Sequence, residues 1–102
     1  MKDLVARAEL HDDAIRELDD AITFLENEWE GRGQLFAAAF NTTLERLLLH
    51  PRAGRTIGRR LRKWMMPRWK FVIIYTIEEY GIFIFAIAHH ARRRNYWRSR
   101  LH

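Results

Sequence analysis

Residues 69–89, WKFVIIYTIEEYGIFIFAIAH, contain two strongly apolar segments separated by the short polar stretch EEYG at 78–81. β-Branched and aromatic residues dominate both segments, which favours strands over helices. EEYG is typical of a hairpin turn, and we expect a positive φ angle at Gly81. Phe71, Ile73 and Tyr75 alternate with equally apolar neighbours, as in central strands that are covered on both faces. This stretch therefore predicts the middle of a sheet.

Two more strands are expected from segments that alternate between apolar and polar residues, KDLVARAEL (2–10) and RRLRKWMMP (59–67). In the first segment Leu4, Ala6 and Ala8 lie on one side. The second segment is strongly basic, which suits either an edge strand protected by charge against aggregation or a contact with an anionic partner.

Two helices are expected between these strands, over 11–31 and 34–51, with the turn GRG between them. Asp12 or Asp13 is the expected cap of the first helix, and Pro51 ends the second. Residues spaced by three and four predict one buried stripe on each helix. These stripes are Ile15, Leu18, Ile22, Leu25 and Trp29 in the first helix, and Phe36, Phe40, Thr43 and Leu47 in the second.

The order β-α-α-β-β-β, with helices and strands segregated along the chain, predicts a two-layer α+β fold. The helices form a hairpin packed on one face of a mostly antiparallel sheet. No second helix pair remains to cover the other face. We expect a single domain over residues 1–102.

Composition excludes several classes of function. The chain has no cysteine, so disulfides, thiolate metal sites and cysteine nucleophiles are excluded. The five histidines show no metal-ligand spacing, and we expect no metal and no cofactor. The apolar runs are far shorter than a membrane span, and the first ten residues do not resemble a signal peptide, so we expect a cytoplasmic protein without membrane contact.

Charge is divided unevenly along the chain. Residues 1–51 contain five Lys or Arg against eleven Asp or Glu, a net charge of −6, whereas residues 52–102 contain thirteen against two, a net charge of +11. Such asymmetry predicts a protein with one basic face, suited to nucleic acid, an acidic protein or the ribosome.

Four segments resemble landmarks of the RelE/ParE superfamily of toxins, often labelled plasmid stabilization proteins. They are AIRELDDAITFLENEW, LLLHPRAG, MPRWKFVIIY and IAHHARRRNYWRSR, which together extend over most of the chain. The resemblance implies the toxin of a type II toxin–antitoxin module, a growth inhibitor that a cognate antitoxin neutralises. It also implies a RelE/ParE-like fold with an acidic antitoxin arm on the sheet or the helices.

The resemblance leaves the target open between two mechanisms. ParE-like members inhibit DNA gyrase, whereas RelE-like members cut mRNA on the ribosome. RelE-like nucleases often carry an arginine in the central strand about three residues before its tyrosine, and this chain has Val72 before Tyr75. The departure favours inhibition of gyrase, with mRNA endonuclease activity as the alternative. A third hypothesis is an RNA-binding or adaptor domain without toxicity.

The basic C-terminal segment supplies most candidate site residues. For a nuclease, the catalytic candidates are His89, His90, Arg92 and Arg93, because histidine titrates near neutral pH and arginine binds phosphate. Adjacent strand residues face opposite ways, so we expect only one of the two histidines to face a given cleft. The candidates for contact with a target or nucleic acid are Arg59, Arg60, Arg62, Lys63, Arg68, Tyr96, Arg98 and Arg100.

Each of these candidates also has a structural interpretation. His89 or His90 can fix the end of the strand through a hydrogen bond. Tyr96 and Trp97 can pack the C-terminal segment onto the sheet, while the arginines remain solvated or pair with the acidic first helix. For Trp97, packing is the favoured interpretation.

Overall fold

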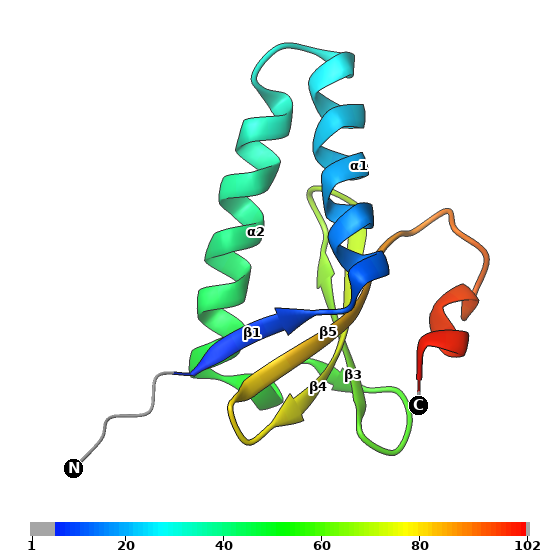
Figure 1. Ribbon diagram of the computed structural model, residues 1–102. Helices are drawn as coiled ribbons and strands as arrows, with labels where there is room; N and C mark the ends of the chain where they lie inside the picture. Colours follow the sequence, from blue (N-terminus) through cyan, green and yellow to red (C-terminus); the bar gives the residue numbers. More distant parts are fainter. Residues whose placement is uncertain (1–5, 102) are drawn as a thin grey trace.

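The computed structural model describes residues 6–101 and has two helices packed on one face of a five-stranded sheet (Figure 1). The elements follow in the order β1 (Arg7–Leu10), α1 (Asp12–Glu28), α2 (Arg32–Leu49), the 3-10 helix η1 (Pro51–Ala53), β2 (Arg55–Thr56), β3 (Leu61–Met66), β4 (Phe71–Glu78), β5 (Gly81–His89) and the 3-10 helix η2 (Tyr96–Arg100). The predicted α+β class and the helical hairpin are confirmed. The short strand β2 was not predicted, and Leu4 lies outside the described residues.

The hairpin of β4 and β5 forms the centre of the sheet, as predicted. The strand order is β1-β5-β4-β3-β2, in which β1 runs parallel to β5 and the other neighbours are antiparallel. Gly81 has a φ angle of 145°, and a side chain there would overlap the backbone of Arg7 in the adjacent strand. Glycine at this position therefore permits both the turn and the close approach of β1.

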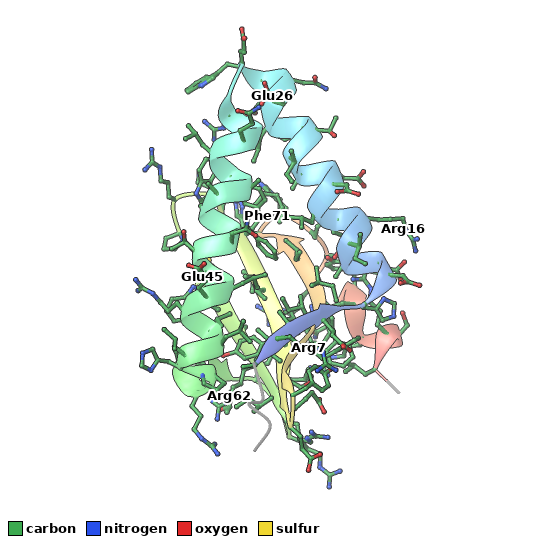
Figure 2. All side chains as sticks on the ribbon, turned by 60° about the vertical axis from the view of Figure 1, so that its left-hand side comes forward. Arg7, Arg16, Glu26, Glu45, Arg62 and Phe71 are labelled. Carbon is green, nitrogen blue, oxygen red and sulfur yellow. The ribbon has the colours of Figure 1, made fainter. Side chains whose placement is uncertain are left out.

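Two apolar cores lie on opposite faces of the sheet. On the helical face, Phe71, Ile73 and Tyr75 pack against buried side chains that include Phe36 and Phe40 of α2, and Figure 2 shows Phe71 between the helices and the sheet. On the other face, the buried residues Leu61, Ile74, Ala86 and Trp97 form a smaller cluster. The predicted alternation of β4 is confirmed, and the C-terminal segment covers the face for which the sequence offered no helix pair.

Two details of α1 differ from the prediction. The cap is His11, whose Nδ1 accepts a hydrogen bond from the backbone N–H of Asp13 at 3.0 Å, so neither Asp12 nor Asp13 caps the helix. The buried stripe is rotated: Ala14 and Ala21 are buried, while Ile15 and Trp29 are 46% and 64% exposed. Small side chains let α1 approach the sheet closely, so they occupy the buried face in place of the bulkier residues.

Tyr75 fixes the connection between α2 and β2. Its side chain is fully buried, and its hydroxyl donates a hydrogen bond to the carbonyl of Pro51 at 2.7 Å. The same oxygen accepts a hydrogen bond from the N–H of Gly54 at 2.9 Å. Burial raises the pKa of Tyr75, so the phenol stays protonated at neutral pH. Tyr75 therefore orients the chain that leads into Arg55.

We predict that Tyr75→Phe lowers the free energy of unfolding by about 1–3 kcal/mol, because it leaves buried backbone groups of Pro51 and Gly54 without a partner. The matched control is Tyr80→Phe in the β4–β5 turn, where the phenol is only half-buried. Urea unfolding of the purified chain measures both variants. Equal loss of stability in the two variants would contradict the role given to Tyr75.

Candidate functional site

A basic cleft of about 530 Å³ lies between the far face of the sheet and the C-terminal segment. Its floor is apolar and includes Val72, Ile74 and Ala88. Six cations surround this floor, and no acidic side chain lines the cleft within residues 6–101. The cations are Arg55, Lys63, Arg92, Arg93, Arg94 and Arg98.

The six cations of the basic cleft are free of ion pairs within the described part of the chain. Elsewhere, Arg7, Arg16 and Arg60 pair with carboxylates at exposed positions. Unneutralised like charges on a concave surface reinforce one another and raise the local concentration of anions. The basic cleft is therefore suited to bind a polyanion.

Both histidines line one edge of the basic cleft, with ring centroids 4.5 Å apart. The expectation that only one would face it was wrong, because β5 ends at His89 and the strict alternation of a strand no longer applies to His90. Burial, followed by the charges of His90 and Lys70, lowers the pKa of His89. His89 is therefore neutral at physiological pH, and its ring packs edge-on against Phe71 at 5.2 Å.

A cluster around Glu17 of α1 holds the C-terminal segment that forms one wall of the cleft. Strand β1 pairs with β5 only as far as Ile84, so among residues 6–101 no strand neighbours this edge of β5 beyond Ile84. There the N–H of Ile87 donates to the Glu17 carboxylate at 2.9 Å. Figure 2 shows the C-terminal segment beside the first turns of α1.

Two residues of η2 complete this cluster. The hydroxyl of Tyr96 donates to Glu17 at 2.6 Å, and the Arg100 guanidinium donates two hydrogen bonds to the same carboxylate at 2.8 and 3.0 Å. Arg100 also donates to the carbonyl of Phe85 at 2.9 Å. Glu17 and Arg100 thus form hydrogen bonds with backbone groups of β5 that a further strand would otherwise pair with. These contacts connect the C-terminal segment to both α1 and β5.

The pKa values show why this cluster is charged at neutral pH. Burial alone would raise the pKa of Glu17, but the hydrogen bonds from Arg100, Tyr96 and the Ile87 amide outweigh it and lower the pKa below its usual value. Burial and the hydrogen bond to Glu17 raise the pKa of Tyr96, which therefore remains a donor.

Tyr96 also connects the Glu17 cluster to the basic cleft. The guanidinium of Arg92 lies over its ring, 3.9 Å from the centroid, and that of Arg100 lies 5.2 Å from the same centroid. Sequence reasoning missed Glu17, although a signal existed. It lies three residues after Ala14 and four before Ala21, so this carboxylate shares the buried face of α1.

The structure separates the predicted contact residues into several places. Lys63, Tyr96, Arg98, Arg92 and Arg93 meet in the basic cleft, together with Arg55 and Arg94, which were not predicted. Arg59, Arg60 and Arg62 line a second groove of about 320 Å³ with Arg52. Arg68 lies apart, beside α2, and Arg100 is part of the Glu17 cluster.

Two further features bear on the chemistry of this site. Among the described residues, no three His, Cys, Asp or Glu side chains come together as possible metal ligands. No helix within residues 6–101 combines the length and apolar character that crossing a membrane requires.

Comparison with known proteins gives a match over most of the chain. Residues 8–94 match the family described as the ParE toxin of the type II toxin–antitoxin system parDE. A comparison with curated proteins gives no match. The matched region begins in β1 and ends within the basic segment that lines the cleft.

We predict that Glu17→Gln lowers the free energy of unfolding by about 1.5–3 kcal/mol, since it removes the charge that Arg100 and Tyr96 bond. It should also speed trypsin cleavage after Arg92 to Arg94, because the C-terminal segment loses its anchor. Asp20→Asn on the exposed face of the same helix is the matched control. An equal effect from Asp20→Asn would contradict the conclusion that Glu17 anchors the C-terminal segment.

The lowered pKa of Glu17 predicts a pH dependence. A carboxylate whose pKa is lower in the folded state stabilises the fold above its unfolded pKa of about 4.3, and this contribution disappears as the pH falls through the folded pKa. The difference in unfolding free energy between the wild type and Glu17→Gln should therefore be largest at pH 7 and shrink below about pH 4. Urea unfolding at pH 7, 5, 4 and 3 measures it, and a difference independent of pH would refute the assignment.

Proposed function

The chain belongs to the ParE toxin family of type II toxin–antitoxin systems, and from that premise we propose that it inhibits DNA gyrase by binding rather than by catalysis. The family implies a cognate antitoxin as its partner. In this proposal residues 1–102 act as one toxin domain in the cytoplasm, where gyrase works, and the antitoxin keeps the toxin inactive.

The apolar floor of the basic cleft carries the proposal. Cleavage of RNA through its 2′-hydroxyl needs an acid, a base and cations that converge on one phosphate. Val72, Ile74 and Ala88 occupy the floor and offer none of these groups. Val72 also stands where RelE-like nucleases often have an arginine. The surrounding cations suit binding to an anionic surface, such as the DNA on which gyrase acts.

A RelE-like mRNA endonuclease remains the second candidate, and the two histidines favour it. His89 and His90 lie together at the cleft edge, near Arg92 and Arg93. The lowered pKa of His89 makes its imidazole neutral, and its Nδ1 already accepts a hydrogen bond from the N–H of Ala91 at 3.1 Å. Against this candidate, the His89 ring packs edge-on against Phe71 and also contacts the ring of His90.

We predict that expression without an antitoxin arrests growth with failure of DNA replication before failure of translation. The purified toxin should stabilise gyrase–DNA cleavage complexes and leave mRNA intact in a translating extract. His90→Ala should retain growth arrest, and His50→Ala is the matched control at an exposed site outside the cleft.

Each alternative gives a different result in the same assays. Cleaved mRNA, lost in His90→Ala but not in His50→Ala, would refute the gyrase proposal in favour of the endonuclease. Absence of growth arrest in the wild type would refute both and leave the adaptor hypothesis.

A further inference from the structure

We propose that the basic cleft and the β2–β3 ribbon bind the phosphate backbone of duplex DNA directly, without reading its sequence. This inference rests on the proposed function and deepens it: the toxin contacts the DNA that gyrase holds as well as the enzyme. The β2–β3 ribbon is defined here as residues 55–63, which contain four arginines and one lysine.

The register of the ribbon places positive charge on both of its faces. Arg55 lies opposite Lys63 and Thr56 lies opposite Arg62 in the antiparallel pair. Residues directly opposite share a face, and successive residues alternate between faces. Arg55 and Lys63 accordingly line the basic cleft, while Thr56 and Arg62 line the second groove. The basic surface thus continues from the C-terminal segment to the edge strand β2, and the second groove lies on the opposite face of the ribbon.

Two guanidinium groups near the ribbon are already oriented by contacts of the guanidinium itself. Arg62 donates to the carbonyls of Arg52 and Gly54, at 3.1 and 2.7 Å, which orients its side chain within the second groove. Arg92 is stacked on Tyr96, which the Glu17 cluster fixes. Guanidinium groups that are already oriented lose less conformational freedom when they bind phosphate.

The aromatic residues of the cleft favour a duplex over a single strand. Recognition of single-stranded RNA depends on exposed aromatic faces on which bases stack. Trp97 is only 5% exposed, and the ring of Tyr96 is covered by the guanidinium groups of Arg92 and Arg100. The cleft therefore offers charge without an open stacking surface, which suits the regular phosphates of a double helix.

An acidic protein is the less favoured occupant of the same surface. Protein interfaces depend on a few well-packed aromatic or aliphatic anchors surrounded by polar groups. The cleft instead has a ring of six cations around a floor of small and branched side chains such as Val72 and Ala88. Phosphates spaced along a duplex match this ring with no further anchor.

The test measures binding of the full chain, made by cell-free synthesis, to a labelled 20-base-pair DNA by fluorescence anisotropy, without gyrase. We expect a micromolar dissociation constant at about 50 mM salt. The logarithm of the association constant should fall with the logarithm of the salt concentration with a slope of about −4, as for four or five neutralised phosphates. Lys63→Gln with Arg93→Gln should weaken binding at least tenfold and reduce the slope by about two.

Arg16→Gln with Arg46→Gln is the matched control, because it removes the same charge from exposed positions on the two helices. It should change the affinity less than threefold. A loss equal to that of the cleft variant would overturn the proposal, because binding would then follow net charge alone. Equal unfolding midpoints for both double variants exclude misfolding as the cause of a lost affinity.

Competing ligands test the class of partner. Tenfold tighter binding of single-stranded or duplex RNA would overturn DNA as the ligand, and equally effective competition by polyglutamate would overturn phosphate recognition. Failure of DNA binding with gyrase poisoning intact refutes only this inference. Loss of gyrase poisoning with DNA binding intact refutes only the proposed function.

Discussion

The carboxylate of Glu17 is the contact on which the arrangement of the C-terminal half depends. Beyond Ile84 no strand in the described part of the chain pairs with the edge of β5 that faces away from β4, and unpaired backbone groups in such a partly buried place are unfavourable. Glu17 bonds the N–H of Ile87, and its partner Arg100 bonds the carbonyl of Phe85. A single ion pair therefore satisfies the strand edge and anchors the C-terminal segment.

The contact between Glu17 and Arg100 joins the acidic first half of the chain to the basic second half. The acidic α1 neutralises Arg100, with Glu17 at 2.8 Å and Asp13 at 3.5 Å, and so attracts the far end of the basic half. The arginines between β5 and η2 line the basic cleft. The guanidinium of Arg100 therefore has a structural role, whereas the neighbouring arginines remain available to bind an external anion.

The central hairpin could be predicted from the sequence, whereas the arrangement of the candidate site could not. The alternation of Phe71, Ile73 and Tyr75 and the turn at Gly81 are local signals, and both are seen in the structure. The rotated stripe of α1 depends on how closely Ala14 and Ala21 approach the sheet, which side-chain hydrophobicity does not encode. Glu17 and Arg100 are 83 residues apart, so their contact is visible only after folding.

The hydrogen-exchange rate of the Ile87 amide in the intact chain tests the contact with Glu17. Strand β4 pairs with one edge of β5 at Ile87, but within residues 6–101 no strand pairs with the other edge, to which this N–H points. The Glu17 carboxylate is therefore the partner that protects this amide. We expect exchange as slow as that of the paired amides in the centre of β5, and much faster exchange in Glu17→Gln. Exchange in the wild type as fast as that of an exposed loop amide would contradict it.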